Sequence, residues 1–197
     1  MIFRRRQTPP AQSHHRGFKP FLRRDFRHRC AYCRIPERVW GSQRNFTVDH
    51  FKPKSRFPHL ALTYGNLYYA CNRCNEIKGT TWPAAHELAR GFRFLDPCQD
   101  NLYARHIQID DHGQIQSQSN AGRYTVLNVR LDRDQLVEWR RNRLAMVREV
   151  RRLVRRKCII AGNFVAYSET AQRLAAELAG EIDDKVRLIK RTHLYPP

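Results

Sequence analysis

The sequences CAYC (residues 30–33) and CNRC (residues 71–74) are two C-x-x-C pairs, and they decide the fold. We expect their thiols to be reduced and to bind one structural zinc ion, because two such pairs supply the four sulfur ligands of a zinc site. The ligands would be Cys30, Cys33, Cys71 and Cys74. Two disulfides or four buried thiols are the alternatives. The remaining cysteines, Cys98 and Cys158, stand alone and are expected to be unpaired core thiols.

The segment between the two pairs predicts the elements that zinc would bring together. NFTVDHF (45–51) has the residue types of a strand, and NLYYAC (66–71) predicts a short strand or turn. NEIKG (75–79) predicts one or two helical turns that Gly79 closes. Upstream, FKPFLRRDFRHR (18–29) predicts a short helix with Leu22 and Phe26 on one face. Zinc would place the strand beside the helix.

Asp49 and His50 lie at the end of the expected strand, where adjacent side chains leave opposite faces. Asp49 and Asn75 can therefore converge on one hard cation while His50 points away from them. A neutral imidazole can take a proton from water, and a divalent cation can neutralise charge on a leaving oxygen. The nearby lysines Lys52, Lys54 and Lys78 could hold phosphate oxygens. This set of groups suits phosphodiester hydrolysis.

CAYC … VDHFKPKS … GNLYYACNRCNEIKG closely resembles the HNH nuclease superfamily over residues 26–80. The resemblance implies a ββα-metal core in which the four cysteines bind structural zinc. It implies that His50 is the general base, that Asp49 and Asn75 are ligands of catalytic Mg²⁺ or Mn²⁺, and that Asn66 braces the loop. Many members of the family have His where this chain has Asn75. With two protein ligands, one of them neutral, cation binding without DNA is expected to be weak.

The rest of the chain extends this resemblance. FLDPCQDN (94–101) and GRYTVLNVRLDRDQLVEWR (122–140) resemble the tail of HNH proteins encoded beside ATPases in bacterial antiphage or mobile-element loci. The resemblance implies an ATPase partner that docks on the C-terminal helices.

The expected fold class is α+β, with a zinc-stapled ββα-metal core, an added β-hairpin and a helical C-terminal region. Residues 1–17 are expected to be a basic mobile arm, residues 18–98 the nuclease core, and residues 99–131 the hairpin extension. Residues 132–197 form the basic helical region, including a second helix at 168–182 capped by Ser168.

The chain is strongly basic, with 37 Lys and Arg residues against 18 Asp and Glu residues and a net charge of +19. Such a surface favours an anionic partner, and the excess of Arg favours nucleic acid. The residues expected to contact it are Lys52, Lys54, Lys78, Arg140, Arg141, Arg148, Arg151 and Arg152. No membrane-spanning stretch and no signal peptide is evident, so we expect a cytoplasmic protein.

These observations lead to two hypotheses. The first is a metal-dependent HNH endonuclease that hydrolyses DNA, or alternatively RNA, by direct attack of water and leaves 3′-hydroxyl and 5′-phosphate ends, as the resemblance implies. The second is a zinc-stapled nucleic-acid-binding module without catalysis. Only the nuclease requires Asp49, His50 and Asn75 together.

Overall fold

The computed structural model describes residues 2–164, 173, 176–177 and 180–181. These residues belong to two compact units. Unit 1 contains residues 2–110 and 114–137, and unit 2 contains residues 111–113 and the described residues from 138 onward. The expected helix at 168–182, with its cap Ser168, lies outside the described residues apart from a few isolated positions.

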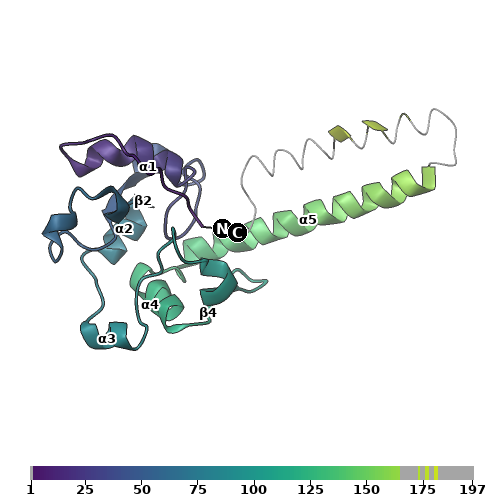
Figure 1. Ribbon diagram of the computed structural model, residues 1–197. Coiled ribbons are helices and arrows are strands. Elements are labelled where there is room, and N and C mark those ends of the chain that lie inside the picture. The colour runs from purple at the N-terminus through teal and green to yellow at the C-terminus, as the bar shows by residue number, and fades with distance from the viewer. Residues whose placement is uncertain (1, 165–172, 174–175, 178–179, 182–197) are drawn as a thin grey trace. The chain divides into compact units, whose positions relative to one another are not determined.

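The centre of unit 1 is a β-hairpin followed by a helix (Figure 1). Strand β1 (Phe46–His50) pairs antiparallel with β2 (Leu67–Cys71), and α2 (Asn72–Lys78) follows β2 directly. Both strands and the helix lie where the sequence predicts them. With the second hairpin and the remaining helices, they confirm the α+β fold class.

Helix α1 (Lys19–Asp25) covers β2 through aromatic and aliphatic side chains. Leu22 and Phe26, predicted to share one face, are both fully buried. The Phe26 ring lies 5.4 Å from the ring of Tyr68, measured between centroids. Burial of such large apolar side chains is the main favourable contribution to folding, at about 1.5–3 kcal/mol each. The face predicted from the sequence is therefore the one that holds α1 to the sheet.

The N-terminal segment, expected to be a mobile arm, contacts this core at three points. Phe3 is buried, and its ring lies 4.8 Å from that of Phe26. Arg5 donates hydrogen bonds to the carbonyl oxygens of Tyr64 and Leu67, each at 2.7 Å. Arg6 also forms an ion pair with Asp25 at 2.9 Å. At least residues 3–6 are therefore part of the folded unit.

The second half of unit 1 contains the predicted second hairpin. It also contains a helix, α4 (Asn120–Val129), that was not predicted from the sequence. The other elements are α3 (Ala85–Ala89), η5 (Leu102–His106), β3 (Ile107–Ile109) and β4 (Ile115–Ser117). The short helical turns earlier in the chain are η1 (His15–Phe18), η2 (Gln43–Asn45), η3 (Pro58–Leu60) and η4 (Tyr64–Asn66). Strands β3 and β4 pair as the predicted hairpin, and Gly113 in its turn has a positive φ of 81°, which glycine adopts without strain.

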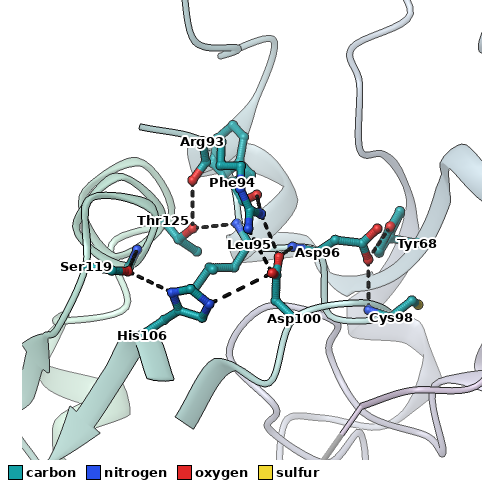
Figure 2. Close-up of polar contacts among 11 residues, drawn as sticks. Tyr68, Arg93, Phe94, Leu95, Asp96, Cys98, Asp100, His106, Ser119 and Thr125 are labelled. Carbon is teal, nitrogen blue, oxygen red and sulfur yellow. Dashed lines mark hydrogen bonds and ion pairs between the residues drawn. The ribbon is translucent and has the colours of Figure 1, made fainter. Parts of the chain in front are cut away.

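Polar contacts hold α4 to the chain that precedes it (Figure 2). Ser119 caps the helix by accepting a hydrogen bond from the Gly122 amide at 3.0 Å, and its Oγ lies 2.7 Å from Nδ1 of His106. Arg93 and Asp100 form a two-pronged ion pair at 2.6 and 2.8 Å. A Cβ atom on Gly122 would lie 2.1 Å from the carbonyl oxygen of His106, so only glycine permits this close approach.

Helix α5 (Asp134–Phe164) begins in unit 1 and continues through unit 2, near the position predicted for the basic helix. Within unit 2, Arg140 is buried and donates from Nε to the carbonyl oxygen of Gly113 at 2.7 Å. Arg148 forms an ion pair with Asp111 at 3.3 Å. In the part of the chain that the structure describes, no helix combines the length and apolar character needed to cross a membrane.

Candidate functional site

Four cysteines form a buried cluster at the base of the first hairpin. The Sγ atoms of Cys30, Cys33, Cys71 and Cys74 all lie within 4.8 Å of one another. None of the four is in a disulfide. The Sγ atoms of Cys33 and Cys71 are 3.9 Å apart, close to the distance of about 3.8 Å that follows from a tetrahedral site with Zn–S bonds of about 2.3 Å. The cluster therefore fits structural zinc, and the disulfide alternative is wrong.

Backbone hydrogen bonds hold the first cysteine pair against the sheet. The amide of Ala31 donates to the carbonyl oxygen of Tyr69 at 2.7 Å, and the amide of Cys30 donates to the carbonyl oxygen of Ile35 at 3.1 Å.

A zinc ion bound by four thiolates carries a net negative charge, which a nearby cation would offset. Arg133 supplies one, because its guanidinium donates to Sγ of Cys74 at 3.3 Å. Sequence reasoning missed Arg133, which lies 59 positions from Cys74 in the chain.

His50 is the last residue of β1, and its imidazole is oriented by the backbone of the following loop. Its Nε2 atom lies 3.0 Å from the carbonyl oxygen of Ala61. A carbonyl oxygen can only accept a hydrogen bond, so Nε2 of a neutral ring must carry the proton. Nδ1 then holds the lone pair. This is the tautomer that a base acting through Nδ1 requires.

Asp49 points to the other side of the strand and is enclosed by protein groups. It accepts hydrogen bonds from the hydroxyl of Tyr32 and from Nζ of Lys78, the latter at 3.2 Å. Burial raises the pKa of Asp49, and the positive charge of Lys78 opposes that rise. Asp49 is thus a hard oxygen donor of the kind that Mg²⁺ or Mn²⁺ prefers. A cation bound to it would compete with the Lys78 ammonium for the carboxylate charge.

Asn66 holds the loop between β1 and β2 in place. Its Oδ1 accepts from the amide of Lys52 at 2.8 Å, and its Nδ2 donates to the carbonyl oxygens of Lys52 and Leu60 at 3.0 and 3.3 Å. Asn75 lies on α2, half-buried and one helical turn before Lys78. The structure therefore places Asp49 next to the helix that carries Asn75, and His50 next to the loop that Asn66 braces.

Two of the predicted nucleic-acid contacts are buried in the structure. Lys78 has a fully buried side chain that also donates to the carbonyl oxygen of His50 at 2.7 Å. Arg140 is 5% exposed. Neither presents its charge to a phosphate, because each is used to bind other parts of the chain. The remaining predicted contacts are exposed: Lys52, Lys54, Arg141, Arg148, Arg151 and Arg152.

His15 is a further residue of the site that sequence reasoning missed. Its ring lies against that of His50, with centroids 4.8 Å apart, and the ring of His14 lies 4.1 Å beyond. Burial and the neighbouring positive groups lower the pKa of His15 to about 4, so its imidazole is neutral at physiological pH. No sequence pattern links His15 to His50, because the contact depends on how the N-terminal segment folds back.

Comparisons with known proteins point to the same family. The HNH endonuclease family matches residues 30–81. A 52-residue stretch is 38% identical to Septu protein PtuB of Bacillus thuringiensis, covering 26% of this chain and 20% of that protein. Septu protein PtuB of Bacillus mycoides (strain KBAB4) is 26% identical over 148 residues, covering 62% of this chain and 49% of the relative. Septu protein PtuA of the same strain is 25% identical over 144 residues, covering 61% of this chain and 20% of the relative.

The chain thus spans at most about half the length of these relatives. The family match contains the four-cysteine cluster and the hairpin that carries Asp49 and His50. Residues 30–81 are therefore an HNH endonuclease domain with a buried four-cysteine cluster, in a chain distantly related to the Septu proteins PtuB and PtuA.

Proposed function

We propose that this chain is a metal-dependent HNH endonuclease that hydrolyses phosphodiester bonds of DNA. The observation that carries the proposal is the hydrogen bond between Nε2 of His50 and the carbonyl oxygen of Ala61. It fixes the proton on Nε2 and leaves the Nδ1 lone pair to accept a proton from water. A module that only binds nucleic acid has no need for a histidine held in one tautomer.

In this mechanism His50 acts as the general base. Nδ1 takes a proton from the attacking water, and the Ala61 carbonyl stabilises the imidazolium that forms, because it keeps accepting from Nε2–H. Asn66 acts as a positioning residue, since it holds the backbone of Lys52 and of Leu60, the residue before Ala61. Exposed Lys52 and Lys54 lie two and four positions after His50 in the chain and would contact flanking phosphates.

The proposed catalytic cation is Mg²⁺ or Mn²⁺, and Asp49 and Asn75 are the residues that would hold it. When bound, it neutralises the charge that develops on the leaving 3′ oxygen. Nζ of Lys78 lies 3.1–3.2 Å from the carboxylate of Asp49, so a cation held there would compete with this ion pair. Two protein ligands leave most of the coordination shell to water and phosphate.

We also propose a role in bacterial defence together with an ATPase partner. The similarity to Septu proteins over 61–62% of the chain supports this proposal. Copurification from a strain that expresses the neighbouring genes tests it: recovery of an ATPase is expected, and its absence under gentle salt conditions would contradict the proposal.

A plasmid-nicking assay tests the nuclease proposal. Supercoiled plasmid is incubated with Mg²⁺ or Mn²⁺ and the wild-type protein, the His50→Ala protein, or the wild-type protein with EDTA. The matched control is His86→Ala, which removes an exposed histidine outside the site. Nicking by the wild type and His86→Ala alone is expected. Nicking that persists in His50→Ala would remove His50 from the mechanism, and salt-dependent binding without nicking by any form would favour the binding module.

A further inference from the structure

A cavity of about 620 Å³ lies in unit 1, outside the hairpin that carries His50. The chain that follows α2, the end of α3 and one side of α4 form its walls. Its lining combines three aromatic side chains, two arginines and one glutamate: Trp82, Phe92, Tyr124, Arg90, Arg123 and Glu87. Sites for small organic ligands span roughly 300–1,000 Å³, so the cavity has the size of a binding site.

Hydrogen bonds hold the two long walls of this cavity together. Nδ2 of Asn120, at the start of α4, donates to the carbonyl oxygen of Arg90 at 2.8 Å. Thr125 on the same helix accepts from the Leu95 amide at 2.8 Å and donates to the carbonyl oxygen of Arg93 at 3.5 Å (Figure 2). The helix that carries Arg123 and the segment before Arg93 are thus fixed to each other. The cavity is therefore preformed rather than dependent on a ligand for its shape.

The two arginines at the cavity are available to a ligand, whereas Glu87 accepts a hydrogen bond from the Ala84 amide at 2.8 Å. Arg123 is exposed and forms no ion pair with the described residues. The guanidinium of Arg90 lies over the ring of Phe92, with its carbon 5.5 Å from the centroid. Burial and the negative charge of Glu87 raise the pKa of Tyr124, so its hydroxyl remains a hydrogen-bond donor at neutral pH. The cavity thus offers aromatic faces and unpaired positive charge in one place.

One lining residue of this cavity contacts the residue that follows the proposed base. Trp82 lines the cavity, and its ring lies 5.7 Å from that of Phe51, the residue after His50. Nζ of Lys52 lies 5.9 Å from the centroid of the same Trp82 ring, and Arg56 donates to the Trp82 carbonyl oxygen at 2.9 Å. Two basic residues that follow His50 in the chain therefore lie beside the tryptophan that lines the cavity.

We propose that this cavity binds one unpaired nucleotide of the strand that is cut at His50. The inference rests on the proposed nuclease function and deepens it, since it names nucleic acid with unpaired nucleotides as the substrate class. The base would stack on the aromatic side chains, and Arg90 and Arg123 would contact its phosphates. Aromatic rings and arginines are the groups on which proteins stack unpaired bases, whereas bases inside a duplex cannot enter such a cavity.

Tryptophan fluorescence of the full chain tests the proposal. The sequence has three tryptophans, so Trp40→Phe and Trp139→Phe leave Trp82 as the only emitter, and His50→Ala prevents cleavage. The zinc-loaded protein is titrated with a single-stranded oligonucleotide and with an abasic strand of equal length. We expect the first to quench Trp82 and to bind about five- to a hundredfold more tightly than the abasic strand. Equal quenching and equal affinity would overturn the proposal.

Charge reversal at the cavity gives a second test. Arg90→Glu with Arg123→Glu should weaken binding of the single strand about tenfold more than binding of the duplex. The control pair is Arg24→Glu with Arg44→Glu, which changes two exposed arginines elsewhere by the same charge and should weaken both ligands equally. All four positions are exposed, and circular dichroism checks that the variants fold. Equal losses for both ligands in the cavity variant would overturn the proposal.

The two proposals fail in different ways. Plasmid nicking without base-dependent quenching would retain the nuclease and exclude a nucleotide from the cavity. Quenching without nicking would retain the nucleotide site and remove the catalytic function. An absence of quenching by any strand overturns the inference.

Discussion

Nζ of Lys78 lies 3.2 Å from Oδ1 and 3.1 Å from Oδ2 of Asp49, and it also donates to the carbonyl oxygen of His50. The Lys78 side chain is fully buried and that of Asp49 is 5% exposed. One ammonium group therefore links α2 to the two neighbouring residues that the proposed mechanism uses. Its removal would affect the stability of the fold and the charge balance of the site together.

Lys78→Met should destabilise the protein strongly. The substitution keeps the length of the side chain but leaves a buried carboxylate without its counter-ion, and breaking one partner of a buried ion pair costs about 3–5 kcal/mol. Denaturant unfolding measures the loss, and Lys54→Met, at an exposed lysine, should change the free energy of unfolding by less than about 0.5 kcal/mol. Lys78→Met combined with Asp49→Asn should recover part of the stability. Equal losses from Lys78→Met and Lys54→Met would disprove the role assigned to the ion pair.

Divalent cations should stabilise the Lys78→Met protein more than the wild type. A cation that binds Asp49 competes with Lys78, so removal of the ammonium group should raise cation affinity. A ligand that binds only the folded state stabilises it in proportion to the logarithm of its concentration over Kd. Melting temperatures measured with increasing Mn²⁺ check this expectation. If Asp49 is not a cation ligand, both proteins will show the same shift.

Loss of one cysteine of the cluster should abolish zinc binding and the folded core. Cys71→Ser removes a ligand from the cluster, and structural zinc sites contribute directly to the free energy of folding. The measurement is zinc content by atomic emission together with near-ultraviolet circular dichroism. Cys98→Ser is the matched control, because Cys98 lies outside the cluster. Zinc that remains at full occupancy in Cys71→Ser would contradict the assignment.

Glu37 should make the protein sensitive to acid. Burial alone would raise the pKa of Glu37, but hydrogen bonds from Arg23, Tyr69 and His28 outweigh it and lower the pKa to about 2. A carboxyl whose pKa is lower in the folded state contributes stability above its ordinary pKa of about 4.5, and this contribution disappears as the pH falls toward 2.

Glu37→Gln should therefore lower stability at pH 7 and flatten the decline below pH 4.5. Urea unfolding at a series of pH values measures both effects. Glu76→Gln provides the control, since Glu76 is an exposed acid in a surface ion pair with Arg73. A slope below pH 4.5 that is unchanged by Glu37→Gln would show that other carboxyls dominate acid unfolding.

The ββα frame could be predicted because its determinants are local. The C-x-x-C pairs have fixed spacing, and the residues of β1 and β2 have strong strand preferences. Helix α4 could not be predicted in this way. Its sequence NAGRYTVLNV contains Gly122 and several β-branched residues, which are weak helix formers, and burial of Val126 and Val129 overrides that preference.

The positions of some site residues could likewise be predicted from the local sequence, whereas others depend on contacts between distant segments. Asp49 and His50 lie on opposite faces of β1, as strand alternation requires, so their separation could be read from the sequence. The burial of Lys78 and Arg140 could not, because a lysine or arginine on an amphipathic helix is usually solvated. The contact of His15 with His50 depends on the course of the N-terminal segment, for which the sequence has no periodic pattern.

The aromatic core around Tyr68 limits how this HNH domain can be separated from the rest of the chain. The family match covers residues 30–81, but Phe26 contacts Tyr68 from before this segment, and Asp96 accepts the hydrogen bond of its hydroxyl from beyond it. A peptide cut at the limits of the family match would expose this aromatic core to water. The segment that identifies the family is thus smaller than the unit that folds, and grafting it into another protein would require the flanking residues as well.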